Sequence, residues 1–213
     1  YESQDDSIKS CFQDDSGNKI EVEGQVLIGA DGLHSAVRAQ MHPDEGPPIW
    51  GGPVMWRGTT EAVPIRTGAS FVLVGKLEQR FVCYPISNPD PATGKATINW
   101  IAELTYDTSQ GWGDGDWNTK VSIDKFLKEF EDWSFEWLDV PELIKGASDV
   151  YEYPMVDRDP LDHWVDGRCV LIGDAAHVMY PVGSNGASQA IVDTRILGAA
   201  FHRHGIGTEA LGL

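Results

Sequence analysis

The N-terminal part of the chain alternates between apolar and polar positions as paired β-strands do. Residues 8–12 and 19–29 predict two strands, and the run "DDSGN" between them favours a hairpin turn. The end of the second strand, "VLIGA", is apolar on both faces, as a buried strand of a parallel sheet would be. The next stretch, "DGLHSAVRAQM", predicts a turn followed by a short helix.

The middle of the chain is dominated by strand patterns. After the breaker-rich run "HPDEGPPIWGGP", the pattern predicts four strands near 53–61, 70–76, 80–87 and 95–104, each with turn residues at its ends. Consecutive strands joined by short turns favour an antiparallel sheet.

Two helices are predicted after these strands. Residues 121–133 carry apolar side chains at helical spacing, and Ser122 is the predicted N-cap. The apolar positions are Ile123, Phe126, Leu127 and Phe130. The stretch "PELIKGA" predicts one further short helix that ends at its glycine.

The C-terminal part returns to an α/β pattern. Residues 151–168 are rich in proline and charge and predict an irregular segment, whereas "CVLIGD" predicts another buried strand. From Asn185 to His204, small and apolar residues recur on one narrow helical face that could pack closely against a sheet. The residues of this predicted face are Ala187, Ala190, Ile191, Thr194, Leu197, Gly198 and Phe201.

These patterns predict a mixed α/β protein with an α+β insertion. Residues 1–50 and 151–213 together supply a nucleotide-binding type of α/β layer, and residues 51–150 supply an antiparallel sheet with helices. The chain begins at Tyr1 rather than at methionine and stops shortly after a helix, so we expect an internal fragment of a longer protein.

Composition excludes some partners. The formal net charge of −17 would repel a nucleic acid or an anionic membrane, and no apolar run reaches membrane-spanning length. Cys11, Cys83 and Cys169 have neither disulfide-framework nor zinc-ligand spacing, so no metal site is predicted and a reducing cytoplasm fits. The oligomeric state stays open.

Candidate chemistry lies at the ends of the two predicted parallel strands. Asp31 follows Gly29 in "LIGADG", and Asp174 follows Gly173 in "LIGDAAH". Ligands of open α/β sheets usually bind at the carboxyl ends of the strands. A carboxylate there accepts hydrogen bonds from sugar-like hydroxyl groups, and adjacent glycines let a flat or phosphorylated ligand approach the backbone.

The turn "YPVGSNGAS" leads directly into the long helix. Gly183 and Gly186 leave the helix start without large side chains, and we expect one of them to need a positive φ. The unpaired N–H groups and positive dipole end of a helix favour a ligand that carries or develops negative charge, as the ring of a reduced flavin does. The pattern therefore places Asp174 at the ribityl hydroxyls and the helix start at the flavin ring.

At this point two motifs carry a family resemblance. "GADGLHSAVR" and "GDAAHVMYPVGSNGASQAIVD" resemble the second and third fingerprints of the FAD-dependent aromatic hydroxylases, the single-component flavoprotein monooxygenases. "MWRGTTE" and "YPMVDRDPLDHW" are most similar to the phenazine-modifying branch, that of 5-methylphenazine-1-carboxylate 1-monooxygenase.

The resemblance implies a partial glutathione-reductase-type FAD-binding domain with an inserted antiparallel substrate-binding sheet. The family's opening Gly-x-Gly-x-x-Gly unit and its C-terminal helical region are missing from this sequence. It implies that Asp31 lies near the FAD pyrophosphate and the approach path of NAD(P)H, and that Asp174 binds the ribityl chain. The implied cofactor-binding residues are Asp31, Gly32, Arg38, Gly173, Asp174, Pro181, Gly183, Ser184, Asn185, Gly186 and Ala187.

The substrate residues are less sharply indicated. Flat aromatic substrates favour aromatic walls with few polar anchors, but alternation along a strand does not tell which face of the sheet is the pocket. The candidates are Trp56, Arg57, Tyr84, Trp100 and Tyr180. Arg57 pairs either with a substrate carboxylate or with Glu61. His177 is expected to be a packed histidine bonded to backbone, and Arg38 to brace the turn after Asp31.

The implied activity is hydroxylation of an aromatic or heteroaromatic, phenazine- or salicylate-like substrate by FAD, with O2 as co-substrate and NAD(P)H as transient reductant. Hydroxylation is decarboxylative if the substrate bears an ortho or ipso carboxylate. No residue is assigned as catalytic, since the cofactor supplies the reactive chemistry. Two alternatives stay open: another flavoprotein of the superfamily, such as an epoxidase or a reductase, and a non-catalytic fragment. The 213-residue chain alone is expected to be inactive.

Overall fold

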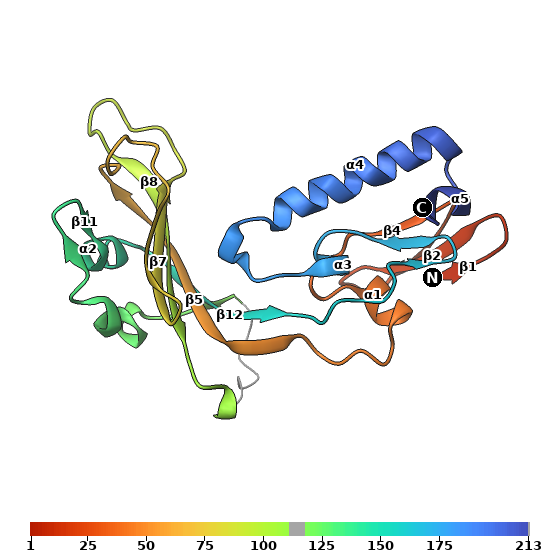
Figure 1. The fold of residues 1–213 in the computed structure, drawn as a ribbon, viewed down its shortest axis with the longest axis horizontal. Coiled ribbons are helices and arrows are strands. Elements are labelled where there is room, and N and C mark those ends of the chain that lie inside the picture. The colour runs from red at the N-terminus through yellow and green to blue at the C-terminus, as the bar shows by residue number, and fades with distance from the viewer. Residues whose placement is uncertain (111–117, 213) are drawn as a thin grey trace. The chain divides into compact units, whose positions relative to one another are not determined.

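A computed structural model describes residues 1–110 and 118–212, and its contacts divide the chain into two compact units. Unit 1 joins Tyr1–Ile49 to Val156–Leu213, and unit 2 is Trp50–Met155. Figure 1 shows that unit 1 is therefore built from both ends of the chain, coloured red and blue.

The first sheet of unit 1 is a small antiparallel one. It contains β1 (Glu2–Ser3), β2 (Ile8–Gln13) and β3 (Lys19–Gly24), in that order. The predicted hairpin is present, since β2 and β3 pair antiparallel. The Asp14 carboxylate stabilises the turn between them by accepting hydrogen bonds from the backbone N–H groups of Ser16 and Asn18. The prediction of one strand over 19–29 is wrong: β3 ends at Gly24, and the chain leaves this sheet for another.

The second sheet of unit 1 contains β13 (Val165–Asp166), β14 (Cys169–Leu171) and β4 (Leu27–Gly29), in that order. The central strand β14 is fully buried, and β4 runs parallel to it, as predicted. The prediction that β4 is buried on both faces is wrong, because Ile28 is 42% exposed. In the described part of the chain β4 has a neighbour on one side only, so it is an edge strand.

Five helices belong to unit 1 in its described residues: α1 (Ala36–Met41), α3 (Asp174–His177), the 3₁₀ turn η4 (Pro181–Gly183), α4 (Gly186–His204) and α5 (Thr208–Leu211). The long predicted helix is thus confirmed as α4. Its predicted sheet-facing side is only partly right.

Four members of the predicted face are exposed, namely Ala187, Ile191, Thr194 and Gly198. Ala190 and Leu197 are half-buried, and so is Asp193, which was not predicted to lie on this face. The reason is a close approach at Gly173, where a Cβ would lie 3.3 Å from that of Ala190. This contact turns α4 so that Asp193 faces the strand end.

Unit 2 is built on a six-stranded sheet with the order β6-β7-β8-β5-β12-β9. Its strands are β5 (Ile49–Ala62), β6 (Val72–Lys76), β7 (Gln79–Pro85), β8 (Ala96–Thr105), β9 (Thr119–Lys120) and β12 (Val150–Asp157). The four predicted strands are confirmed, and the pairs that join them are antiparallel. The prediction of an irregular segment is wrong for β12.

Short helices cover one face of this sheet. They are η2 (Ile123–Lys125), η3 (Leu127–Phe130) and α2 (Val140–Lys145). A small hairpin of β10 (Ser134–Phe135) and β11 (Leu138–Asp139) connects η3 to α2. The 3₁₀ turn η1 (Thr108–Gln110) comes before these helices in the chain. The helix predicted over "PELIKGA" is confirmed as α2, and Gly146 is its C-cap.

The α-helix predicted over 121–133 is wrong in type. The segment forms two 3₁₀ turns, η2 and η3, although Ser122 caps the first as predicted. Phe126, between the turns, leaves helical geometry at φ −137°, and both Phe126 and Phe130 are fully buried. Burying both rings against the sheet thus overrides helical propensity.

The two faces of the sheet differ in chemistry. The helix-covered face contains the core of unit 2, in which Trp56 is fully buried and stacks on Phe126 with ring centroids 4.5 Å apart. The opposite face, here called the second face, carries Arg57, Arg80, Val82, Tyr84, Asn99, Ile101 and Glu103. Among the described residues no helix is long and apolar enough to cross a membrane.

Candidate functional site

Asp174 occupies the end of β14, at the first residue of α3. Gly173 before it has φ +58° and ψ −143°, a conformation that favours glycine, and its N–H donates to Asp193 Oδ2 at 2.8 Å. The Asp174 side chain is exposed and makes no hydrogen bond or ion pair with any residue that the structure describes. Its carboxylate is therefore available to a ligand.

The start of α4 lies beside this carboxylate. A Cβ on Gly186 would be 3.9 Å from Asp174 Oδ1, and the N-cap residue Asn185 makes no side-chain capping bond. The first N–H groups of α4 are thus not capped by that side chain. The positive φ expected at Gly183 or Gly186 is instead found at Ser184, at φ +53°.

The remaining predicted residues of this turn lie in η4 and at the start of α4, and their contact with the flavin ring stays a prediction. Pro181 and Gly183 bound η4, and Ala187 is the second residue of α4. Tyr180 is the half-buried N-cap of η4, in unit 1.

Asp31 has a structural task at the start of α1. Its Oδ1 accepts from the Ser35 hydroxyl at 2.5 Å, and its Oδ2 accepts from the backbone N–H of Ala36 at 2.8 Å. Gly32 follows with φ +79°, which gives the turn its shape. The carboxylate therefore holds the helix start, and its predicted place near a pyrophosphate stays a prediction.

Arg38 is 2% exposed and braces unit 1. Its Nε and Nη2 donate to the two Glu45 carboxylate oxygens at 2.7 and 2.6 Å. Its Nη1 donates to the carbonyls of Ala175 and Ala176, and Nη2 also reaches that of Asp159. A guanidinium has five N–H donors, so all of them have protein partners.

Arg38 therefore braces Glu45, Asp159 and α3 rather than the turn after Asp31 that was predicted, and it has no donor left for a direct cofactor contact. The hydrogen bonds from Arg38 hold the pKa of the Glu45 carboxyl below its ordinary value, with burial opposing that shift.

Asp193 is a site residue that sequence reasoning missed. Its Oδ2 accepts from Gly173 N–H and lies 2.7 Å from His177 Nε2, so one carboxylate ties α4 to the strand end and to α3. His177 is packed, as predicted, with its ring 5.2 Å from that of Trp164, but its partner is this carboxylate rather than backbone. The overlooked signal is an acidic residue between Ala190 and Leu197 on an otherwise apolar helix face.

The structure corrects two predicted substrate residues. Trp56 and Trp100 are fully buried on the helix-covered face, where Trp56 Nε1 donates to Glu152 and Trp100 Nε1 donates to Thr60. They are core residues, because the strand pleat turns them away from the second face.

Arg57 and Tyr84 do lie on the second face. Arg57 donates through Nε to Asn99 Oδ1 at 2.9 Å, so the pairing with Glu61 that the sequence left open is not formed; Glu61 accepts from Thr97 instead. Tyr84 stacks on Phe71 with ring centroids 5.3 Å apart. Both rings line a cleft of about 580 Å³ in unit 2.

The donor set around Asp174 fits the flavin end of FAD. Ribityl hydroxyls need an acceptor, which the unpaired carboxylate supplies, and the carbonyl edge of the ring needs donors, which the uncapped start of α4 supplies. Glycines at 173, 183 and 186 keep side chains out of the space between them.

The two buried thiols do not add nucleophilic chemistry. Cys83 and Cys169 are buried, and burial raises the pKa of each to about 11. Both therefore stay protonated near neutral pH. No group of three His, Cys, Asp or Glu side chains among the described residues could hold a metal ion.

Comparisons with known proteins agree with this picture. A family model described as FAD binding domain matches residues 138–209. Phenazine 1,6-dicarboxylic acid hydroxylase PhzS of Lysobacter antibioticus is 42% identical over 196 residues, covering 92% of this chain and 48% of that protein. 3-Amino-4-hydroxybenzoate 2-monooxygenase PtnB3 of Streptomyces platensis is 32% identical over 199 residues, covering 92% and 46%.

Solved structures share the fold. The crystal structure of Klebsiella pneumoniae HpxO complexed with FAD and uric acid superposes with a TM-score of 0.76 at 22% identity, over 99% of this chain and 50% of that one. The chain spans about half the length of the curated relatives it matches.

Proposed function

Because the chain belongs to the FAD-dependent aromatic hydroxylases, we propose that the protein containing it is a monooxygenase that hydroxylates an aromatic or heteroaromatic carboxylic acid. FAD is its cofactor, O2 its co-substrate and NAD(P)H its reductant. When bound, FAD supplies the oxygen activation and transfer. The residues of this chain hold the cofactor and the substrate.

The observation that carries the proposal is the unpaired Asp174 carboxylate beside the uncapped start of α4. Both lie inside the stretch that matches the FAD-binding family model. In the loaded protein, the Asp174 carboxylate would accept hydrogen bonds from the ribityl hydroxyl groups, and the first N–H groups of α4 would donate hydrogen bonds to the flavin ring. The positive end of the helix dipole stabilises negative charge on that ring.

Asp31, Gly32 and Arg38 act on the cofactor through the backbone that they hold. Asp31 fixes the start of α1, and Arg38 fixes the carbonyls of Ala175 and Ala176 directly after Asp174. Arg38 therefore positions the strand-end turn.

The substrate class follows from two supports. The two relatives described above are named for aromatic carboxylic acids, a phenazine dicarboxylic acid and an aminohydroxybenzoate. In unit 2, the cation Arg57 binds Asn99, which lies directly across from Tyr84 of the aromatic pair Tyr84 and Phe71. We propose a phenazine- or salicylate-like acid. Where its carboxylate sits on the carbon that is hydroxylated, the carboxyl group leaves as CO2.

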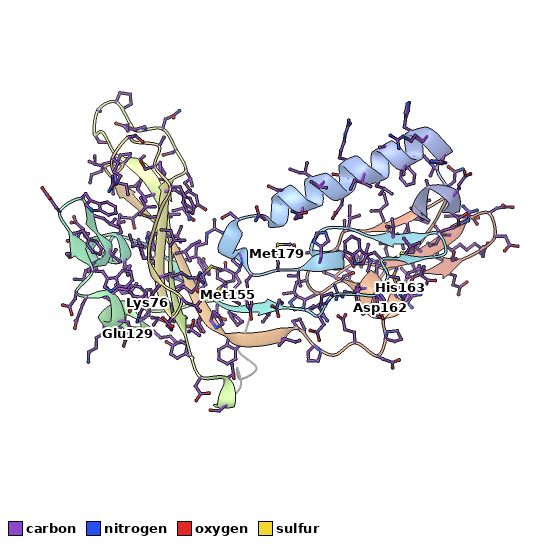
Figure 2. The ribbon with its side chains drawn as sticks, in the orientation of Figure 1. Lys76, Glu129, Met155, Asp162, His163 and Met179 are labelled. Atoms are coloured by element: carbon purple, nitrogen blue, oxygen red, sulfur yellow. The ribbon has the colours of Figure 1, made fainter. Side chains whose placement is uncertain are left out.

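The test uses the complete protein and the variant Asp174→Ala. Loss of a hydrogen bond to a charged group costs about 1.5–3 kcal/mol, so FAD affinity should fall by roughly 10- to 100-fold with the fold intact. Flavin content after extensive dialysis and the FAD dissociation constant are the readouts. Asp162→Ala, at another exposed aspartate of unit 1 that is labelled in Figure 2, is the matched control and should keep its flavin.

Unchanged FAD affinity in Asp174→Ala would contradict the site. The reaction itself is tested by mass spectrometry of products formed under ¹⁸O2 from a panel of aromatic acids. Incorporation of one labelled oxygen supports hydroxylation. NAD(P)H oxidation that yields only peroxide, or a reduced ring without label, would favour a different flavoprotein activity.

A further inference from the structure

An unpaired hydrogen-bond donor is buried on the second face of the unit 2 sheet. Asn99, in the middle of β8, is fully buried, and its Nδ2 has no hydrogen-bond partner among the described residues. Its Oδ1 accepts from Arg57 Nε, which can only donate, so the amide cannot be reversed to relieve the unpaired group. A buried unpaired N–H is costly and indicates an acceptor that binds there.

Arg57 brings a charge to the same place. Its Nε is tied to Asn99, while its terminal Nη atoms take no partner from the residues that the structure describes. Two other basic groups of this face, Arg80 and Lys120, are neutralised by ion pairs with Glu103 and Asp149. Arg57 is therefore the unneutralised cation on the second face in the described chain, and its guanidinium plane is held by the amide that has the unpaired donor.

An aromatic wall adjoins these donors. Tyr84 lies directly across from Asn99 in the β7–β8 register and stacks on Phe71. The two rings line the cleft of about 580 Å³, which can take a flat ligand. Arg57 and Asn99 do not line this cleft but lie beyond Tyr84 on the same sheet face. A cation, an amide donor and a stacked aromatic pair thus lie together on one sheet face.

We propose that Arg57 and Asn99 form the recognition site for the carboxylate of the aromatic substrate, an inference that rests on the proposed function. One carboxylate oxygen accepts from the Arg57 Nη atoms and the other from Asn99 Nδ2, as charge-assisted hydrogen bonds. The Arg57–Asn99 bond orients the fork before the ligand arrives. These two residues select acids over neutral analogues of the same shape.

The test compares two probes on the complete, FAD-loaded protein: phenazine-1-carboxylate and phenazine-1-carboxamide. Dissociation constants come from the change in flavin absorbance on binding. The unchanged protein should bind the carboxylate at least 10-fold more tightly than the carboxamide. Arg57→Met should abolish that preference, and Asn99→Leu, which removes both the donor and the orienting acceptor, should reduce it several-fold.

The matched control is Thr105→Val, an exposed position on the same sheet face at the last residue of β8. It should leave the preference unchanged. FAD content and the thermal midpoint are measured for each variant. If the buried change at Asn99 prevents folding, the exposed Arg57→Met variant still decides the result.

Equal binding of both probes by the unchanged protein, or an undiminished preference in Arg57→Met, would overturn the inference. Failure of the proposed function looks different: the protein would not retain FAD or would not incorporate oxygen from O2. Hydroxylation of neutral and acidic probes with equal efficiency would leave the proposed function standing and remove this recognition site.

Discussion

The two units are stabilised internally by different kinds of contact. The core cluster of unit 2 contains 17 buried residues, including the rings of Trp56, Phe81, Trp100 and Phe126, whereas the cluster of unit 1 contains three, Leu171, Ala175 and Ala176, among the residues described. Unit 1 instead depends on polar ties. Arg38, Asp193 and Arg168 each join segments distant in sequence through hydrogen bonds.

The difference shows which surfaces each unit leaves exposed. Unit 2 buries its large rings against its own helices, so its core is complete within residues 50–155. In unit 1, α4 has no buried residue, and Ile191 and Ile196 are 68% and 64% exposed. Apolar area of this kind marks a surface that gains stability from a covering partner. The following substitutions should therefore affect the two units differently.

The largest effect is expected from Trp56→Ala in unit 2. Removing a fully buried indole leaves a cavity and leaves Glu152 with Lys125 as its remaining donor, so unit 2 should lose about 4 kcal/mol of unfolding free energy. Hydrogen-exchange mass spectrometry should show faster exchange in β5 and β8 and little change in β14. Trp137→Ala, at a side chain that is 38% exposed, is the control. An equal loss of unfolding free energy in that variant would contradict the view that the buried core around Trp56 stabilises unit 2.

Next is Arg38→Leu in unit 1. The leucine leaves Glu45 with only its ion pair to Arg158 and removes the Arg38 donors from three carbonyls, which should cost about 3 kcal/mol. Exchange should rise in α1 and α3 while the unit 2 strands keep their protection. Arg203→Leu, on the exposed last turn of α4, should change little. Loss of protection confined to unit 2 would argue against polar ties in unit 1.

Acid should loosen the same tie reversibly. The pKa of Glu45 in the folded protein is lowered from 4.5, so the stability from its bond to Arg38 is present above that pH and is lost as the pH falls below it. Exchange in α1 and α3 should therefore rise in this acid window. Glu45→Gln should flatten the pH dependence, and an unchanged profile in that variant would contradict the assignment.

A smaller effect is expected from Asp193→Asn. The amide oxygen can still accept from Gly173 N–H, but the charge-assisted contact with His177 is lost, which should cost about 1.5 kcal/mol. Exchange at Gly173 should accelerate, and FAD retention by the complete protein should weaken. Arg195→Gln, exposed two residues along α4, provides the comparison. Equal FAD retention in both variants would show that the hydrogen bonds of Asp193 stabilise the fold without contributing to FAD binding.

The smallest effect is expected from Ile191→Ser on the exposed face of α4. In this chain the substitution should shift stability by less than about 0.5 kcal/mol, because the side chain is mostly in water. In the complete protein the same change should cost more if a further segment covers α4. An equal, negligible effect in both would show that this face stays open.

Periodicity along the chain was enough to find most elements. The alternation in residues 53–61 and 95–104 predicted β5 and β8, and the register between them confirms that Trp56 and Arg57 point to opposite faces. The motif around Gly173 and the turn before α4 were likewise readable, since both depend on neighbouring residues. Local patterns of this kind reflect backbone geometry, which acts over a few residues.

Tertiary structure decided what depends on distant partners. Phe126 and Phe130 are helically spaced, yet their burial against the sheet gave two 3₁₀ turns. Asp193 reaches Gly173 across 20 positions, and Arg57 reaches Asn99 across 42. The sequence by itself determined β5 to β8, β14, the long helix and the strand-end Asp174. Which sheet face carries Arg57, and which acid holds Gly173, was set only by packing, because hydrogen bonds and burial join residues whose separation no local period encodes.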